Sequence, residues 1–124
     1  MLKGKTVVIV DDNLANVFAL KAVLKPFGCN ILTAINGREC LDVLKKSSQV
    51  DIILLDMMMP VMDGYETIKE IRKNPVTRQI PIVSLTAQAM ETDVKRCLNT
   101  GANGYCSKPI NIDNLMKIIA SVLL

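Results

Sequence analysis

The sequence has no histidine and no tryptophan, and its aromatic residues are two phenylalanines and two tyrosines. Without histidine, the chain cannot itself supply a histidine general base, a histidine-containing zinc site or a phosphohistidine. Because 50% of the residues are hydrophobic but only 3% are aromatic, the core must be aliphatic and rich in methionine. No apolar run approaches the length of a membrane span, and no secretory hydrophobic segment starts the chain. We therefore predict a cytoplasmic protein with no membrane contact.

Cysteine motifs and cationic clusters are also missing. None of the four cysteines lies in a CxxC spacing, which argues against a redox motif or a thiolate zinc site and favours free thiols in a reducing compartment. The 15 Lys and Arg residues exceed the 12 Asp and Glu residues by 3, but they form no dense cluster and are not interleaved with aromatic residues. This distribution predicts no direct contact with nucleic acid.

Short β-branched runs alternate with segments of helical periodicity along the whole chain. The runs predict strands at residues 5–10, 30–34, 51–56, 81–86 and 104–107. The segments between them predict helices near 14–25, after 36–37, from 63 to about 74, near 89–99 and after 111. Five strand–helix units in series predict one α/β domain over residues 1–124, with a parallel sheet between two layers of helices.

The apolar residues of two predicted helices imply which side is buried. In the first, Leu14, Val17 and Phe18 have roughly helical spacing and are predicted to lie mostly in the core. In the fourth, Met90, Val94 and Leu98 are predicted to share one apolar side.

Polar side chains follow four of the five predicted strands at their carboxyl ends. They are Asp11 and Asp12 after the first strand, Asp56 at the end of the third, Thr86 at the end of the fourth and Lys108 after the fifth. In parallel sheets, ligands bind outside this edge, where strand order reverses. Three carboxylates gathered there would repel one another, and carboxylate, carbonyl and water oxygens are the ligands of Mg²⁺. The pattern therefore predicts a magnesium site facing a lysine.

The order and spacing of these residues resemble the receiver domain of two-component response regulators. The matching segments are VVIVDDN (7–13), DIILLDMMMPVMDG (51–64), VSLTA (83–87) and GANGYCSKPI (101–110). The resemblance covers almost the whole chain and implies the flavodoxin-like strand order 2-1-3-4-5. Right-handed crossover connections between parallel strands are compatible with this order.

The resemblance also implies a role for each of the three aspartates at the strand ends. Asp56 would accept a phosphoryl group from a phosphohistidine on a partner. Asp12 and Asp56 would ligate Mg²⁺ directly, the backbone carbonyl of Met58 would complete the protein ligands, and Asp11 would act through the metal or its water. A carboxylate needs no base to deprotonate it at neutral pH, so the lack of histidine is no obstacle.

The same resemblance implies roles for four further residues, of which two take part in the switch. Thr86 would hold one phosphoryl oxygen and Lys108 would neutralise another. Tyr105 would fill the space that Thr86 leaves, so that phosphorylation alters the surface of the fourth helix, fifth strand and fifth helix. Pro109 would follow a cis peptide bond, which X–Pro pairs permit.

These roles describe a signalling module, not an enzyme acting on other molecules, because it catalyses only its own phosphorylation and dephosphorylation. The expected partners are a histidine kinase or histidine phosphotransfer protein, and either a downstream protein or a second copy of the chain at the switch surface. Met1 and the end of the chain at the fifth helix favour a stand-alone protein, but a receiver excised from a hybrid kinase would have the same sequence.

Three alternatives remained open from the sequence. A haloacid-dehalogenase-type phosphohydrolase also uses an aspartyl phosphate, but its nucleophile lies in a DxD pattern, whereas this chain has adjacent Asp11 and Asp12. A flavin-binding module shares the topology, but the loop after Val10 is acidic. A receiver that serves only as a docking scaffold would not need the complete acidic, Thr and Lys set.

Two positions near the predicted site differ from receivers that lose phosphate quickly. Met58 lies two residues after Asp56, and Gln88 lies two residues after Thr86. Because a methionine side chain cannot usefully orient water, we predict slow dephosphorylation.

Asp63 and Gly64 are interpreted as a helix cap and a turn.

Overall fold

A computed structural model of the chain describes residues 2–47, 49–59, 61–87 and 91–123. The strands are β1 (Thr6–Val10), β2 (Asn30–Ala34), β3 (Ile52–Asp56), β4 (Ile82–Thr86) and β5 (Gly104–Ser107). The helices are α1 (Leu14–Leu24), α2 (Gly37–Lys46), α3 (Gly64–Lys73), α4 (Glu91–Thr100) and α5 (Ile112–Leu123), and a 3-10 turn, η1 (Lys25–Phe27), follows α1. The predicted alternation of strands and helices is confirmed.

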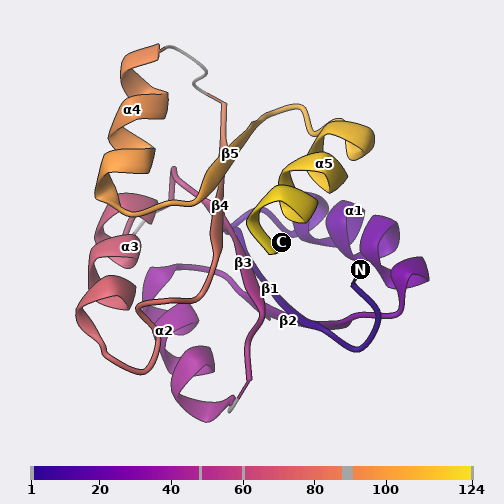
Figure 1. The fold of residues 1–124 in the computed structure, drawn as a ribbon, viewed down its shortest axis with the longest axis horizontal. Coiled ribbons are helices and arrows are strands. Elements are labelled where there is room, and N and C mark those ends of the chain that lie inside the picture. Colours follow the sequence, from indigo (N-terminus) through magenta and orange to yellow (C-terminus); the bar gives the residue numbers. More distant parts are fainter. Residues whose placement is uncertain (1, 48, 60, 88–90, 124) are drawn as a thin grey trace.

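The five strands form one parallel sheet in the order β2-β1-β3-β4-β5, so the predicted fold class is confirmed (Figure 1). Val10 at the end of β1 pairs with Ala34 of β2 on one side and with Leu55 of β3 on the other. This register places the residues that follow β1 beside the end of β3, at the carboxyl edge of the sheet.

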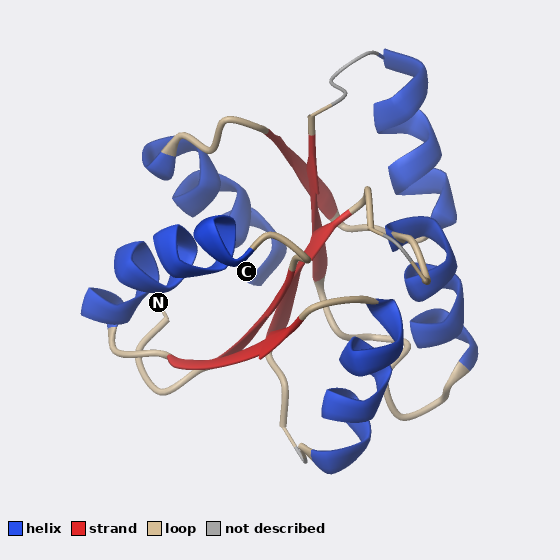
Figure 2. Cartoon of the chain, turned by 180° about the vertical axis from the view of Figure 1, so that it is seen from behind, coloured by secondary structure: helices blue, strands red, loops and turns tan. Residues whose placement is uncertain are grey.

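Helices cover both faces of the sheet, with α1 and α5 on one face and α2, α3 and α4 on the other (Figures 1 and 2). Each face has its own aliphatic core, because successive strand residues point to opposite sides. In β3, Ile53 and Leu55 pack in the core beneath α2, α3 and α4, whereas Ile52 and Leu54 pack beneath α1 and α5. A strand buried on both faces accounts for the unbroken apolar run before Asp56.

The prediction that Leu14 and Phe18 lie mostly in the core is wrong. In α1 the buried residues are Val17, Leu20 and Leu24, whereas Leu14 is 61% exposed and Phe18 is 68% exposed. Apolar residues occur on every side of this helix, so periodicity alone could not identify the side that packs against the sheet.

The predicted apolar side of the fourth helix is also wrong in part. The structure has Cys97 as the buried residue of α4, while Leu98 is 43% exposed and Val94 is half-buried. Met90 lies outside the described residues, as does the predicted start of this helix at 89.

Arg72 of α3 ties together segments that are distant in the sequence. Its guanidinium donates to the carbonyl oxygen of Gly101 from Nε at 3.0 Å and from Nη2 at 2.8 Å. Nη1 donates to the carbonyl oxygens of Arg78 and Ile80, each at 2.8 Å, and Nη2 also reaches Oδ1 of Asn103 at 2.8 Å. One side chain therefore joins α3 to the loops before β4 and after α4.

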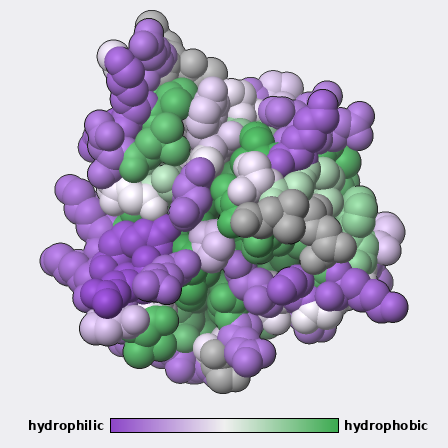
Figure 3. Space-filling view, viewed as in Figure 1, coloured by the Kyte–Doolittle hydropathy of each residue, from purple (hydrophilic) through white to green (hydrophobic). Residues whose placement is uncertain are grey.

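The exterior carries most of the charge. Figure 3 shows mainly hydrophilic residues along the outer side formed by α3 and α4. No helix in the described part of the chain combines the length and the apolar character needed to cross a bilayer.

Candidate functional site

Three carboxylates meet at the carboxyl edge of the sheet. Asp11 and Asp12 follow β1, and Asp56 is the last residue of the neighbouring β3. One carboxylate oxygen from each lies within 4.8 Å of the other two. Asp11 and Asp56 are buried, whereas Asp12 is exposed, so the cluster opens to solvent on one side.

Backbone and amide donors hold the two buried carboxylates in place. Oδ1 of Asp56 accepts a hydrogen bond from the backbone N–H of Met58 at 3.2 Å, and Oδ1 of Asp11 accepts one from Asn13 at 2.9 Å. Oδ2 of Asp11 also accepts from the side-chain amide of Asn16 at 3.3 Å. The sequence analysis missed Asn16; its place in the first turn of a helix that begins beside Asp11 was the available signal.

Lys108 brings the positive charge that the sequence pattern predicted. Its Nζ lies 3.4 Å from Oδ2 of Asp11 and 3.3 Å from Oδ1 of Asp56, and the side chain is 23% exposed. The backbone N–H of Lys108 donates to the carbonyl oxygen of Thr86 at 2.8 Å, which fixes the segment after β5 against the end of β4. The peptide bond between Lys108 and Pro109 is cis in the structure.

The surroundings of Asp56 oppose its negative charge. Burial raises the pKa of this carboxyl, and the negative charge of Asp11 acts in the same direction. The N–H of Met58 and the ammonium of Lys108 lower the pKa of Asp56 but do not cancel the effect of burial. A cation placed among the carboxylates would lower the pKa of Asp56 and favour its charged form.

Of the remaining predicted site residues, Thr86 lies at the carboxyl edge and Tyr105 does not. Thr86 ends β4 and is buried, whereas Tyr105 is the second residue of β5, pairs with Ser84 in the middle of β4 and is 38% exposed. Met58 follows Asp56 by two residues and is 60% exposed. Gln88 lies outside the described residues.

The loop after β3 also shows why Asp63 and Gly64 occur there. Oδ1 of Asp63 accepts a hydrogen bond from the N–H of Glu66 at 2.9 Å and caps α3. A Cβ at Gly64 would lie 2.7 Å from the Cα of Met57, so only glycine allows the helix to start this close to the strand. The predicted capping role of Asp63 is confirmed, whereas Gly64, predicted as a turn residue, is the first residue of α3.

The donor set of the cluster fits a hard divalent cation. Three carboxylates supply oxygen ligands, and the described part of the chain contains no other group of three or more acidic or thiol side chains able to hold a metal. The four cysteines are free and lie apart from this cluster in the sequence. Oxygen ligands at an edge open to water suit Mg²⁺, which retains several waters in protein sites.

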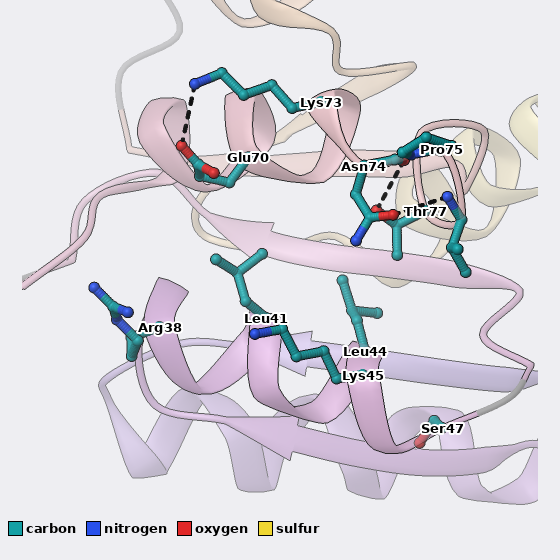
Figure 4. A pocket seen from close by; sticks show the side chains of 11 residues that line it. Arg38, Leu41, Leu44, Lys45, Ser47, Glu70, Lys73, Asn74, Pro75 and Thr77 are labelled. Atoms are coloured by element: carbon teal, nitrogen blue, oxygen red, sulfur yellow. Dashed lines mark hydrogen bonds and ion pairs between the residues drawn. The ribbon is translucent and has the colours of Figure 1, made fainter.

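A large groove lies away from these carboxylates. It has a volume of about 850 Å³ and runs between α2 and α3. Figure 4 shows Leu41 and Leu44 on its α2 side, with Glu70 paired to Lys73 across its α3 side. Glu70 is the only carboxylate among the residues that line it, so this groove cannot gather the ligands of a metal ion. We place the candidate site at Asp56 because the chemistry, and not the cavity size, identifies it.

Comparison with known proteins agrees with the fold. Residues 7–120 match the model of the response regulator receiver domain family. The chain belongs to this family. It is 34% identical over 119 residues to the polar-differentiation response regulator DivK of Brucella anthropi, and the match covers 96% of each protein. The same receiver domain spans only 8% to 14% of the length of four curated histidine kinases that it also matches.

Two solved receiver structures are close in shape to this domain. One is the receiver domain of the sensor histidine kinase PA1611 from Pseudomonas aeruginosa, crystallised with a magnesium ion coordinated in its active-site cleft. Its TM-score is 0.87 and its identity 32%, over 97% of this chain and 98% of that one. The other comes from the co-crystal of the Saccharomyces cerevisiae phosphotransfer protein Ypd1 with the receiver domain of Ssk1. Here the TM-score is 0.86 and the identity 30%, over 97% of this chain and 89% of that one.

Proposed function

We propose that this receiver domain takes a phosphoryl group from a phosphohistidine of a partner protein onto Asp56, with Mg²⁺ bound among the carboxylates. The observation that carries the proposal is the convergence of Asp11, Asp12 and Asp56 within 4.8 Å, with Nζ of Lys108 at 3.3 Å from Asp56. Phosphoryl transfer requires mainly alignment and neutralisation of charge, and this arrangement supplies both.

In the transfer step, an oxygen of Asp56 forms a bond to phosphorus while the bond from phosphorus to the histidine nitrogen breaks. The electron pair of that bond stays on the nitrogen of the partner, and the product is an aspartyl phosphate. Asp12, Asp56 and the carbonyl of Met58 would hold Mg²⁺, which neutralises phosphoryl charge when bound. Lys108 lies where it can stabilise a further phosphoryl oxygen.

The chain then acts as a switch and not as an enzyme on other molecules, because the phosphoryl group stays on its own side chain. Thr86 ends β4, which pairs with the strand of Asp56, and Tyr105 lies on β5, on the other side of β4. We infer that Thr86 contacts the new phosphoryl group and that Tyr105 changes position, which alters the α4, β5 and α5 surface offered to a downstream protein or a second copy.

The exposed residues of α1 suggest where the phosphohistidine partner binds. Leu14 and Phe18 are exposed on α1, which begins two residues after Asp12, although large apolar side chains are normally buried. Other residues of the same helix, among them Asn16 and Leu20, line a cavity of about 300 Å³ together with Asp11 and Lys108. The Ypd1 complex of a related receiver supports a histidine phosphotransfer protein or a histidine kinase as the partner.

The phosphoacceptor is tested with acetyl phosphate and Mg²⁺, followed by mass mapping of the labelled residue. Wild-type protein should gain one phosphoryl group at Asp56, and Asp56→Asn should gain none while keeping its circular dichroism spectrum. Asp113→Asn, which changes an exposed aspartate on α5, should label like the wild type. Label at any residue other than Asp56 would refute the assignment.

The metal and partner sites have separate tests. MgCl₂ should raise the melting temperature of the wild type, and Asp12→Asn should reduce that rise; an unchanged response would remove Asp12 from the metal site. Phe18→Ala should slow transfer from a phosphohistidine donor identified by transfer profiling, but not labelling by acetyl phosphate. Phe27→Ala, 44% exposed at the other end of α1, is the matched control. Equal transfer rates for both variants would exclude the α1 surface.

A further inference from the structure

Three consecutive methionines after β3 differ sharply in their exposure. Met57 is 1% exposed and Met59 is 8% exposed, and both pack in the core beneath α2, α3 and α4. Met58 between them is 60% exposed. Core packing therefore accounts for two of the three side chains and does not account for Met58.

Met58 lies beside the phosphoacceptor in a position open to solvent. Its backbone N–H donates to Oδ1 of Asp56 at 3.2 Å, so its side chain starts next to the carboxylate. An open cavity of about 500 Å³ is lined by all three methionines together with Asp63, Tyr65 and Arg96, and Met58 is by far the most exposed of the three. The guanidinium of Arg96 stacks 3.8 Å from the centre of the Tyr65 ring. A small oxidant can thus reach the sulfur of Met58 without any opening of the core.

We propose that Met58 is an oxidation site for hydrogen peroxide, and that its sulfoxide shortens the lifetime of the phosphate on Asp56. The second part rests on the proposed function. In the oxidation, a lone pair of the Met58 sulfur attacks one peroxide oxygen and the O–O bond breaks. The products are methionine sulfoxide and water, so sulfur loses the two electrons that peroxide gains.

Oxidation of Met58 changes the ability of its side chain to form a hydrogen bond with water. A thioether is a weak hydrogen-bond acceptor, so reduced Met58 does not orient a water toward phosphorus. The sulfoxide carries a strongly polar oxygen in the same place, which can accept a hydrogen bond from the attacking water. One neutral hydrogen bond gained in the transition state corresponds to about a fivefold faster loss of phosphate.

The burial of the neighbouring methionines separates this effect from general damage. Oxidation of Met57 or Met59 would place a polar oxygen in the core and destabilise the fold. Oxidation of exposed Met58 leaves the core unchanged. Methionine sulfoxide is also reversible by methionine sulfoxide reductases, so the modification can be removed.

The first experiment maps oxidation without phosphorylation. Folded protein is treated with hydrogen peroxide and sampled over time, and sulfoxide at each methionine is measured by peptide mass spectrometry. We expect Met58 to oxidise faster than Met57 and Met59, and denaturant to remove the difference. If Met57 or Met59 oxidises as fast as Met58 in the folded protein, the site is refuted. This result does not depend on the proposed function.

The second experiment measures phosphate loss. Protein with oxidised or reduced Met58 is labelled by acetyl phosphate, freed of donor, and followed by the decay of labelled protein in Mg²⁺. Oxidation should shorten the half-life about fivefold, and treatment with sulfoxide reductases should restore it. Met58→Leu should show no change with peroxide, whereas Met116→Leu, at a half-buried methionine of α5, should keep the wild-type response.

The outcomes separate the two claims. Equal half-lives for the oxidised and reduced protein would refute the effect on phosphate, even if Met58 oxidises first. A peroxide response that persists in Met58→Leu would assign the effect to another residue. Failure of Asp56 to take up phosphate would refute the proposed function and the lifetime effect together, while the oxidation map would still decide whether Met58 is the reactive methionine.

Discussion

Replacing Arg72 by alanine tests how the fold holds the loops before β4 and after α4. The guanidinium makes five hydrogen bonds, of which those to the carbonyl oxygens of Gly101 and Ile80 are partly buried. Burial lowers the pKa of Arg72, which shows that desolvation of the cation opposes part of this gain. The acceptors at Arg78 and Asn103 are reached by exposed bonds, so water can replace the guanidinium there.

The expected loss follows from the two carbonyl oxygens that water replaces poorly. A hydrogen bond from a charged donor contributes about 1.5 kcal/mol or more, so Arg72→Ala should lower the free energy of unfolding by about 3 kcal/mol. Arg72→Lys should lose about half as much, because an ammonium keeps the charge but cannot span both carbonyl groups. Lys73→Ala should change it by less than about 0.5 kcal/mol, since Lys73 makes one exposed ion pair at 3.5 Å.

The assay is urea unfolding followed by far-ultraviolet circular dichroism, because the chain has no tryptophan for fluorescence. The three variants are compared with the wild type at one pH and one salt concentration. A loss below about 1 kcal/mol for Arg72→Ala, or a loss no larger than that of Lys73→Ala, would refute the view that this side chain joins α3 to the loops at Gly101 and Ile80.

Three further predictions concern the site and the sheet. Burial raises the pKa of Asp56, so its charged form destabilises the metal-free fold above that pKa. Asp56→Asn should therefore be more stable than the wild type in EDTA at pH 7, and this difference in stability should vanish when the pH falls below the pKa of the unfolded chain. Equal stability of the two proteins at pH 7 would contradict this prediction. Ser84→Ala should stabilise the protein by about 1 kcal/mol in urea unfolding, since the buried hydroxyl of Ser84 has no hydrogen-bond partner among the described residues. Thr77→Val should instead lower the free energy of unfolding by a similar amount, because it removes the hydroxyl that donates to the carbonyl oxygen of Ile71 at 2.7 Å. Lys108→Ala should slow labelling by acetyl phosphate on the order of 100-fold, measured against Lys117→Ala; equal rates would remove Lys108 from transition-state stabilisation.

Residue patterns along the chain were enough to predict the elements and the edge that carries the site. Alternating β-branched and helical segments predicted all five strands, and the polar residues at the ends of four of them predicted where the carboxylates would gather. Asp56 follows a strand that is apolar on both faces, and such a charge is costly without partners. Lys108 could be expected there because strand ends in a parallel sheet share one edge.

The sequence could not identify which side of α1 faces the core. Leu14 and Phe18 have the same helical spacing as the residues that are buried, and only the position of α1 against the sheet left them exposed. The same holds for Met57, Met58 and Met59, which are the same residue type but differ in exposure because Met57 and Met59 pack in the core and Met58 does not.

The sequence by itself therefore determined the order of strands and helices and the residue types at the strand ends, because these depend on local periodicity and on chain direction. Only the tertiary structure reveals the contacts of Arg72 and the exposure of Phe18 and Met58. These features depend on how helices and loops distant in the sequence pack together, and local patterns carry no information about that packing.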